Sequence, residues 1–445
     1  MDFIESGVPN LDLVLGGGLV AGSLVMVTGE PGCGKTILTQ QIAFHAAARG
    51  EQVLILTTLS EPHLKLLGYL GTLAFFDEGL VGQRIELLNI YRQLQDDFAN
   101  VGATIVRLVR ERRASLLVLD SFDSVRDLAP NEVAAKELIY ELSAGLGLLG
   151  VTTLVVAAAP GAPYAPELAI ADTIIALRHE HHGARTLATL EVTKMRGAAQ
   201  RNGRHAYRIT AAGVEVYPRQ ETVPPPAAAP AGGRVPFDLP ALDAMLDGGP
   251  PAGDSTAIVG DPGAGKTLLA LQFVLAGARR GERVLFVSFQ ETRRQLLAKA
   301  AALGLEIPAA LAADDGAIIH YVPADLDADA VLADVRRRIA AGVTRLAIDT
   351  LPDLLGGVPD AGRRPGFVAA LLAYARAAGV TTCFTRVIAA GAPPGEGVAR
   401  ADNTMLLRRV ERGAGTLAVL TMRHSDHAPA PRAFTIRPGG MMIVD

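Results

Sequence analysis

The sequence Gly29-Glu30-Pro31-Gly32-Cys33-Gly34-Lys35-Thr36 decides the fold of the N-terminal half of this chain. It has the pattern Gly-x-x-x-x-Gly-Lys-Ser/Thr, and it lies between an apolar run at residues 24–28 and a helix-like segment. A glycine-rich turn in this position directs backbone N–H groups toward phosphate oxygens, and the helix N-terminus adds a partial positive charge. We therefore predict a phosphate-binding loop in which Lys35 contacts the outer phosphates and Thr36 offers its hydroxyl to Mg²⁺.

The same motif returns in the second half of the chain, where it reads Gly260-Asp261-Pro262-Gly263-Ala264-Gly265-Lys266-Thr267. The flanking sequence is repeated as well, since residues 49–54 correspond to residues 280–285. Two copies in register predict a duplicated domain. We expect a first domain over residues 1–220, a second over residues 235–445, and a linker over residues 221–234, where Pro, Ala and Gly favour an extended chain.

Short apolar runs alternate with longer helix-like segments in each copy. In the first copy, the runs typical of buried parallel strands are residues 24–28, 53–57, 116–120 and 153–157. Residues 37–49 and 131–149 have the pattern of helices, and after Asp172 we expect shorter strands at residues 187–192 and 205–210. The alternation predicts an α/β fold with two tandem domains, each a mostly parallel sheet flanked by helices with a β-rich C-terminal part.

One aspartate ends an apolar strand in each copy, at a matching distance from the loop: Asp120 in the first and Asp349 in the second. A carboxylate in this position lies at the C-terminal edge of the sheet, where open α/β sheets bind ligands. We interpret both residues as acids that hold Mg²⁺ through water. The alternative is that they cap the next turn, because Ser121 and Thr350 follow them.

Composition excludes several classes of protein. With 445 residues, 49% hydrophobic and 20% charged, the chain is too long for one ordinary domain and too apolar to be disordered. Its 42 Lys and Arg against 46 Asp and Glu, and its lack of Trp, argue against a nucleic-acid partner. Two cysteines cannot form a secreted disulfide framework, and the apolar runs are too short to span a membrane. Asp2 and Glu5 stand where a secretory signal would be basic, so we expect a cytoplasmic protein.

Taken together, the motifs resemble those of the KaiC-like branch of the RecA-superfamily ATPases, over nearly the whole chain and in both copies. Residues 289–297 are similar to the F-E-E-x-x-x-Q-L run of that family, and Lys-Met-Arg-Gly at residues 194–197 is similar to its K-x-R-G motif. The resemblance implies ATP and Mg²⁺ as cofactors, ATP hydrolysis, and a homohexameric ring with ATP at the subunit interfaces.

The same resemblance implies that Lys194 and Arg196 reach the nucleotide of the neighbouring subunit, and that Arg423 does so in the second copy. On this interpretation both cations of the first copy project from one face of a strand and have no target within their own copy. The alternative is a solvated pair on an edge strand.

The chain departs from the family pattern where the attacking water is activated. The family has two adjacent glutamates after its second strand, whereas this chain has Ser60-Glu61 in the first copy and Gln290-Glu291 in the second. We expect Glu61 and Glu291 to act on the water, and Gln290 to orient it, since an amide is no base. The alternative is that the glutamates cap the next helix.

The second copy departs further. Thr421 and His424 replace the lysine and glycine of the K-x-R-G motif, so that only Arg423 remains. Val398 and Ala399 stand where clock members of the family carry a Ser-Thr acceptor pair. We therefore expect no autophosphorylation at these positions.

Two further groups have competing interpretations. Cys33 lies inside the first loop, where either a low thiol pKa would make it sensitive to oxidation or the position tolerates a small residue. His179, His181 and His182 form either a metal site or, before Gly183, a polar hairpin tip. We favour the second interpretation in both cases.

The sequence predicts an ATP-binding protein with slow hydrolysis that assembles into a nucleotide-bridged ring and acts, with unidentified protein partners, as a KaiC-like regulatory or timing ATPase. Two alternatives stay open: a nucleotide-dependent scaffold or switch with negligible hydrolysis, and a serine/threonine kinase of the KaiC type.

Overall fold

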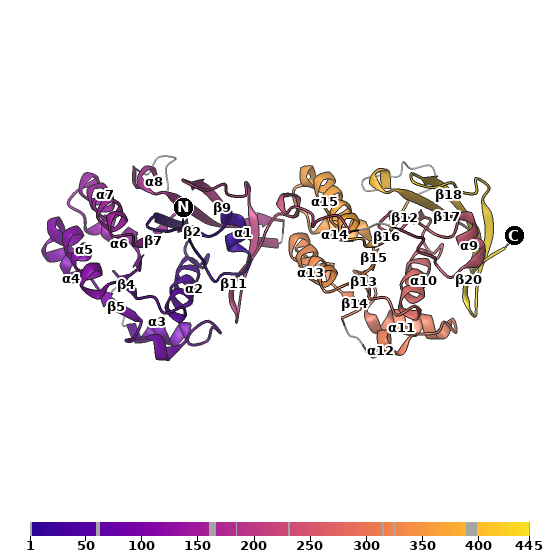
Figure 1. The fold of residues 1–445 in the computed structure, drawn as a ribbon, viewed down its shortest axis with the longest axis horizontal. Coiled ribbons are helices and arrows are strands. Elements are labelled where there is room, and N and C mark those ends of the chain that lie inside the picture. The colour runs from indigo at the N-terminus through magenta and orange to yellow at the C-terminus, as the bar shows by residue number, and fades with distance from the viewer. Residues whose placement is uncertain are drawn as a thin grey trace. The chain divides into compact units, whose positions relative to one another are not determined.

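The computed structural model describes residues 2–58, 63–159, 166–183, 185–229, 232–313, 316–323, 326–388 and 398–444. The chain divides into two compact units, Met1–Thr222 and Val223–Asp445 (Figure 1). Each unit contains one nine-stranded sheet, and the order of the strands is the same in both. The repeat in the sequence therefore corresponds to a repeated fold.

The parallel part of the first sheet has the order β5-β4-β6-β7-β3-β8. Its strands are β3 (Leu24–Gly29), β4 (Val53–Thr57), β5 (Ile85–Asn89), β6 (Leu116–Asp120), β7 (Thr152–Ala158) and β8 (Thr173–His182). All four parallel strands predicted for this copy are confirmed, because continuous apolar runs of this length are buried on both faces of the sheet.

An antiparallel extension completes the first sheet with β9 (Arg185–Met195), β10 (His205–Thr210) and β11 (Gly213–Tyr217). The β-rich end of the copy is confirmed, and so is the short strand expected at residues 205–210, which is β10, but the strand expected at residues 187–192 is longer than predicted. Strands β8 and β9 contain 10 and 11 residues and form a long hairpin. Only the middle of β9 is apolar, since its ends are polar and partly exposed, so the sequence pattern showed only its buried centre.

The helices of the first unit are α1 (Leu11–Leu15), α2 (Lys35–Ala48), α3 (His63–Leu70), α4 (Tyr91–Asp96), α5 (Val101–Arg112), α6 (Phe122–Leu128), α7 (Glu132–Leu148) and α8 (Pro166–Ile170). Both predicted helices are confirmed as α2 and α7. Helix α2 begins directly at Lys35, two residues before the expected start, and Asn131 caps α7 by accepting a hydrogen bond from the backbone N–H of Ala134 at 3.0 Å. A separate two-stranded sheet joins β1 (Phe3–Ile4) to β2 (Leu19–Val20).

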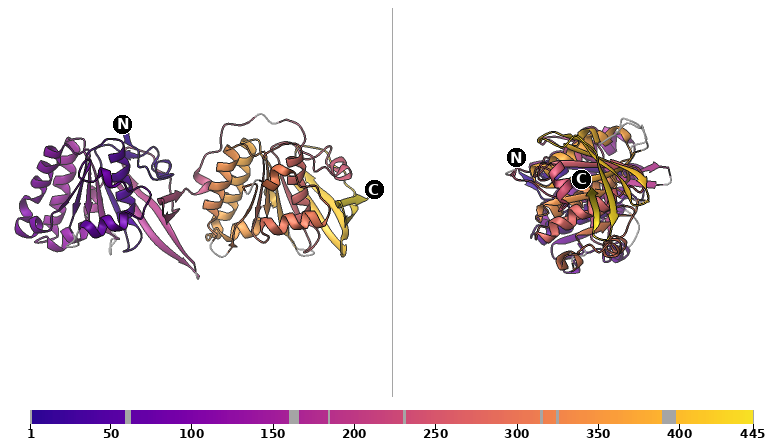
Figure 2. Two further views of the ribbon diagram at one scale, coloured as in Figure 1. Left: turned by 90° about the horizontal axis from the view of Figure 1, so that it is seen from below. Right: turned by 90° about the vertical axis from the view of Figure 1, so that its right-hand side faces the viewer.

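Helices cover both faces of each sheet, as Figure 2 shows. Successive residues of a strand point to opposite faces. In β3, Val25 and Val27 therefore pack on the side of α2, while Leu24 and Met26 pack on the side of α5, α6 and α7. The two apolar layers hold the sheet between them and fix the edge at which its strands end.

The second unit repeats this arrangement. Its strands are β12 (Ser255–Gly260), β13 (Val284–Ser288), β14 (Ile318–His320), β15 (Arg345–Asp349), β16 (Thr381–Val387), β17 (Asn403–Glu411), β18 (Ala414–Met422), β19 (Arg432–Arg437) and β20 (Gly440–Val444). Its helices are α9 (Pro240–Met245), α10 (Lys266–Arg279), α11 (Arg293–Ala302), α12 (Ala309–Ala313), α13 (Ala328–Ala340), α14 (Leu351–Gly356) and α15 (Arg364–Ala377). Strand β12 lies between β16 and β17 as β3 lies between β7 and β8. The chain is thus an α/β protein with two tandem RecA-like domains.

Within the described part of the chain, none of the helices has both the length and the apolar character that crossing a membrane requires.

Candidate functional site

The glycine-rich loop of the first unit connects the end of β3 to the start of α2 (Figure 1). Gly32 and Gly34 have φ angles of +84° and +88°, a region that side chains with a Cβ atom rarely adopt. A Cβ atom on Gly34 would also lie 2.3 Å from Cδ1 of Ile209. The loop therefore depends on glycine for its backbone path, and α2 begins where that path ends.

The lysine of each loop folds back over the loop itself. The amine of Lys35 donates hydrogen bonds to the carbonyl oxygens of Gly29 and Glu30, at 2.8 and 2.9 Å. In the second unit the amine of Lys266 donates to the equivalent carbonyl oxygens, at 3.1 and 2.7 Å. Burial lowers the pKa of Lys266. Each loop therefore presents a cation that is held by carbonyl oxygens.

A threonine at the start of the helix meets the aspartate at the end of a strand in both units. Thr36 Oγ1 donates to Oδ2 of Asp120 at 2.7 Å, and Thr267 Oγ1 donates to Oδ2 of Asp349 at 2.9 Å. Burial raises the pKa of both carboxyl groups, with the threonine hydrogen bonds acting in the opposite direction. The structure thus places hydroxyl and carboxylate oxygens, the donor type that Mg²⁺ prefers, beside each loop.

The alternative role of Asp349 as a helix cap is wrong. Helix α14 is capped by Thr350, whose hydroxyl accepts a hydrogen bond from the backbone N–H of Asp353 at 3.3 Å. In the first unit Ser121 occupies the cap position of α6 and makes no side-chain cap bond. Both strand-ending aspartates instead bond to the threonine of the loop.

The second aspartate has a partner that the sequence analysis missed. Oδ1 of Asp349 accepts a hydrogen bond from the hydroxyl of Thr385 in β16. In the first unit the residue that pairs with Asp120 in the adjacent strand β7 is Val156, which has no hydroxyl. The two sites therefore differ in how their carboxylates are held.

The residues expected to act on water are placed only in the second unit, since Ser60 and Glu61 lie outside the described residues. Gln290 Nε2 donates to Oδ2 of Asp353 at 2.9 Å, and Glu291 Oε1 lies 2.5 Å from the amine of Lys299. Thr292 caps α11 through a reciprocal pair of bonds with Gln295, so the alternative that Glu291 caps this helix is wrong.

Lys194 and Arg196 have partners within their own unit, contrary to the sequence prediction. The amine of Lys194 donates to the carbonyl oxygens of Leu168 and Ala169, at 3.1 and 2.8 Å. Arg196 donates to the Ala169 carbonyl and to Asp172, both at 3.3 Å. A bulge in β9 lies between Val192 and Lys194, and β9 ends at Met195, one residue before Arg196. The two side chains nevertheless converge on the same carbonyl oxygen.

The second unit holds its remaining cation in a related way. Arg423 donates to the carbonyl oxygen of Ala399 at 2.9 Å, which matches the contact between Arg196 and Ala169. The carboxylate of Asp402 pairs with Arg376 instead of with Arg423. Thr421, at the position of Lys194, pairs with Thr404 in the adjacent strand.

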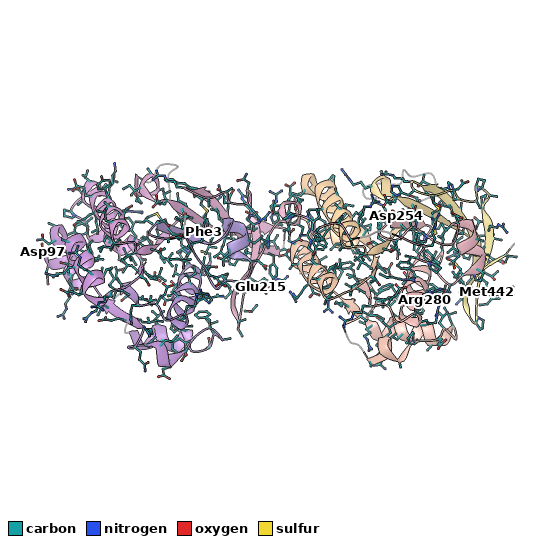
Figure 3. All side chains as sticks on the ribbon, viewed as in Figure 1. Phe3, Asp97, Glu215, Asp254, Arg280 and Met442 are labelled. Atoms are coloured by element: carbon teal, nitrogen blue, oxygen red, sulfur yellow. The ribbon has the colours of Figure 1, made fainter. Side chains whose placement is uncertain are left out.

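His424 belongs to a cluster that the sequence did not reveal. Its Nδ1 lies 3.1 Å from both carboxylate oxygens of Asp254, which is labelled in Figure 3. Together with Asp402 these residues are the one group, among the residues that the structure describes, that brings three metal-ligating side chains together. Arg376 lies 3.4 Å from Asp254 and pairs with Asp402, so the acidic side chains of the cluster already face a cation.

The two weaker groups follow the interpretations that we favoured. Cys33 is buried and its pKa is raised by that burial, which opposes formation of a reactive thiolate. The histidines lie at the end of β8 in the β8–β9 hairpin, where His181 Nδ1 is 3.0 Å from the Thr186 hydroxyl and Gly183 forms the turn. They form the expected polar hairpin tip.

A parallel sheet with a glycine-rich loop after its first core strand, repeated in two units, defines a RecA-like P-loop fold. A comparison with protein-family models matches residues 4–221 and 235–445 to the family described as "ATPase: KaiC". The chain belongs to this family and is a KaiC-like ATPase.

Similar proteins cover the whole length of the chain. It is 26% identical over 465 residues to the "Circadian clock oscillator protein KaiC" of Picosynechococcus sp., with 99% of this chain and 89% of that protein aligned. The protein of the same name from Rippkaea orientalis is 26% identical, with 99% and 88% aligned. The one from Nostoc sp. is 25% identical over 472 residues, with 99% and 89% aligned. The alignments therefore run through both segments of this chain that match the family model.

Proposed function

We propose that each of the two domains, residues 1–220 and 235–445, binds ATP with Mg²⁺ in its glycine-rich loop, and that residues 221–234 link them. One observation carries the proposal. Both units place a lysine amine over the loop and a threonine hydroxyl against the aspartate that ends a strand, with matching partners and similar distances. The presence of this arrangement in both copies favours a shared ligand over a loop that merely joins a strand to a helix.

The residues present fit an ATP–Mg²⁺ group. Among the residues that the structure describes, the amines of Lys35 and Lys266 bond only to carbonyl oxygens of the loop, so each can turn to phosphate oxygens without breaking an ion pair with them. Because burial raises the pKa values of Asp120 and Asp349, a divalent cation nearby would stabilise their ionised forms. When bound, Mg²⁺ supplies positive charge that offsets the charge developing on the phosphates.

The proposed phosphate-binding set consists of the loop residues in both units. In the first unit these are Gly29, Glu30, Pro31, Gly32, Cys33, Gly34, Lys35 and Thr36, and in the second they are Gly260, Asp261, Pro262, Gly263, Ala264, Gly265, Lys266 and Thr267. Their backbone N–H groups and the N-termini of α2 and α10 supply the partial positive charge that favours phosphate.

We further propose slow hydrolysis. Glu61 acts on the attacking water in the first domain, and Gln290 with Glu291 does so in the second. In the second domain Gln290 is an amide and Glu291 is paired with Lys299, so a free carboxylate is missing from this pair. A site that positions ATP but activates water weakly turns over slowly.

A ring with ATP between subunits, most simply a homohexamer, is the proposed assembly. Lys194, Arg196 and Arg423 would then contact the nucleotide bound to a neighbouring copy. Among the described residues, the side-chain hydrogen bonds of Lys194 and Arg423 go to neutral carbonyl oxygens, which suits cations that meet phosphate. The relatives are named as circadian clock oscillator proteins, and we propose a regulatory or timing role in the cytoplasm, with protein partners.

A second candidate function is a scaffold or switch that binds ATP to assemble and barely hydrolyses it. The ion pair between Glu291 and Lys299 favours it, because a carboxylate that already contacts an ammonium group is not free to contact water. A kinase of the KaiC type has less support, because Val398 and Ala399 carry no hydroxyl at the expected acceptor positions.

Titration calorimetry on single variants tests the binding proposal. Lys35→Ala should abolish one of two ATP sites and Lys266→Ala the other, whereas Lys136→Ala, an exposed change on α7, should keep both. Losing a charged partner of phosphate costs about 2–4 kcal/mol of binding free energy. Two intact sites in both loop variants would contradict the assignment.

A further inference from the structure

The amide of Gln290 is held by a carboxylate that comes from a different element. Gln290 follows β13, and its Nε2 donates a hydrogen bond to Oδ2 of Asp353 at 2.9 Å. Asp353 lies in the first turn of α14, directly after the strand that ends in Asp349. The same Oδ2 accepts a second hydrogen bond, from the hydroxyl of Thr350 at 2.7 Å. The carboxylate that receives the amide is therefore itself fixed in place.

This contact settles the orientation of the amide. An ionised carboxylate can only accept hydrogen bonds, so the NH₂ end of the Gln290 amide must face Asp353. The carbonyl oxygen, Oε1, is bonded to the same carbon and is therefore directed away from the carboxylate. Among the residues that the structure describes, no donor contacts this oxygen, and the Gln290 side chain is exposed.

We propose that Asp353 is a positioning residue that holds Gln290 with Oε1 as a fixed hydrogen-bond acceptor for the water that attacks ATP in the second domain. This inference rests on the proposed function. An amide held in one orientation can align a water molecule although it cannot remove its proton. By aligning the water through Gln290, Asp353 partly compensates for the absence of a glutamate at this position.

The hydrolysis step can be written without a protein base, and every proton is accounted for. The oxygen of the water forms a bond to the γ-phosphorus, and the bond from this phosphorus to the bridging oxygen breaks with its electron pair leaving on ADP. The proton lost by the water ends on the inorganic phosphate or in solvent. Gln290 accepts a hydrogen bond during this step and takes up no proton.

The contact between Gln290 and Asp353 is specific to the second domain. The residue four positions after Asp349 is Asp353, whereas the residue four positions after Asp120 is Ser124. The neighbouring acid in the first unit, Asp123, instead accepts a hydrogen bond from the backbone N–H of Ala158 at 2.8 Å. We therefore expect the two domains to align the attacking water in different ways.

The first test measures ATP turnover in the Lys35→Ala background, so that the second domain supplies the signal. Adding Asp353→Ala should lower kcat about ten- to a hundred-fold and leave KM and ATP affinity nearly unchanged, since misplacing an aligned group affects the chemical step. The Thr350 cap should survive, because it uses the backbone N–H of residue 353. Asp360→Asn, at an exposed aspartate that caps a short helix, is the matched control and should turn over normally.

The second test exchanges the two partners. Gln290→Glu alone places two carboxylates in contact, and their repulsion should prevent any gain in turnover. Gln290→Glu with Asp353→Asn restores a donor for the new carboxylate and should exceed the Lys35→Ala parent by ten-fold or more. A positioning role predicts that the Asp353→Asn change becomes favourable when residue 290 is Glu.

The outcomes separate this inference from the proposed function. Absence of ATP binding at the second domain in the Lys35→Ala protein would contradict the proposed function itself. If ATP binds there, the inference is overturned when Asp353→Ala turns over like its parent, or when the double variant is no more active than Gln290→Glu. If turnover of the Lys35→Ala parent is too slow to measure, the variant with both Gln290→Glu and Asp353→Asn decides the question. Absence of turnover in that variant would also overturn the inference. Thermal unfolding of each variant shows whether a loss reflects the fold instead.

Discussion

The hydroxyl of Thr385 donates a hydrogen bond to Oδ1 of Asp349, while Thr267 donates to Oδ2 of the same carboxylate. Within the described part of the chain, Asp120 receives the equivalent of the second bond, from Thr36, but not of the first, because Val156 lies beside it in the sheet. Asp349 is buried and Asp120 is half-buried, and the loss of hydration raises the pKa of each carboxyl group above its ordinary value of 3.8. Burial thus makes the negative charges less favourable, and a bound cation would stabilise them.

This electrostatic state predicts a pH-dependent difference in stability between Asp349→Asn and the natural protein. For a carboxyl group with a raised pKa, the folded state takes up a proton before the unfolded state does as the pH falls. In Mg²⁺-free buffer at pH 7, Asp349→Asn should therefore be the more stable protein. A pKa raised by one corresponds to about 1.4 kcal/mol of unfolding free energy. The advantage should shrink as the pH falls through the pKa of the folded state and should level off below 3.8.

Urea unfolding at a series of pH values measures this difference. Asp120→Asn should behave in the same direction, and adding Mg²⁺ with ATP should stabilise the natural protein more than either variant. An Asp349→Asn protein that is less stable than the natural one at pH 7 without Mg²⁺ would show that the negative charge of Asp349 is not unfavourable without a bound cation.

Much of the fold could be predicted from the sequence, because the signals are local. The apolar runs, the glycine-rich loop and its repetition predict the parallel strands, α2 and the tandem arrangement, and these predictions are confirmed. The lengths of β8 and β9 could not be predicted, since half of that hairpin is polar and exposed.

The parts of the site that the sequence missed are contacts between distant positions. Thr385 meets Asp349 across 36 positions, and Gln290 meets Asp353 across 63. No spacing in a single sequence reveals such pairs, because they depend on which strands become neighbours in the sheet. The carbonyl partners of Lys194 were missed for the same reason, since α8 comes 25 positions earlier in the chain.

Ring assembly should depend on the cations at the end of β9. The double change Lys194→Ala with Arg196→Ala removes both charges proposed to bridge to the neighbour's nucleotide, so ATP with Mg²⁺ should no longer drive assembly. The hydrogen bonds lost within the unit go mainly to exposed carbonyl groups, so the fold should be retained. Light scattering at micromolar protein with saturating ATP and Mg²⁺ measures the particle mass. Arg107→Ala, an exposed change on α5, is the control, and a ring of unchanged mass in the double variant would disprove the bridging role.

The buried ion pair beneath the second sheet should be important for stability. Arg345 is fully buried and donates to both carboxylate oxygens of Glu282, at 2.7 Å each, and to the carbonyl oxygen of Pro236 at 2.7 Å. Glu282→Ala leaves this guanidinium without its anion and should cost about 3–5 kcal/mol of unfolding free energy. Denaturant unfolding measures the loss, and Glu137→Ala on the exposed face of α7 should cost far less. A loss below about 1 kcal/mol would show that water or another group compensates the charge.

Turnover should be limited by water activation in the first domain as well, where Ser60 stands in place of a carboxylate. Losing a positioned base lowers a rate by about 10²–10⁴-fold, so turnover should fall well below the roughly 1–100 s⁻¹ of active phosphoryl-transfer enzymes. The first domain should supply most of the turnover, because it alone keeps Lys194 together with Arg196. Lys35→Ala should therefore lower the rate more than Lys266→Ala does.

Ser60→Glu, measured in the Lys266→Ala background, tests whether the missing carboxylate is the cause. Restoring the adjacent pair with Glu61 should raise kcat and leave ATP affinity nearly unchanged, because a base near the water acts on the transition state rather than on bound ATP. Glu61→Gln should lower kcat if Glu61 is the surviving base, and should leave kcat alone if that residue only caps a helix, at a cost of about 1 kcal/mol of stability. Ser60→Gln is the matched control, since it adds the same bulk without the charge. A folded Ser60→Glu protein that binds ATP and turns over no faster than Ser60→Gln would show that residue 60 does not occupy the position of the missing carboxylate.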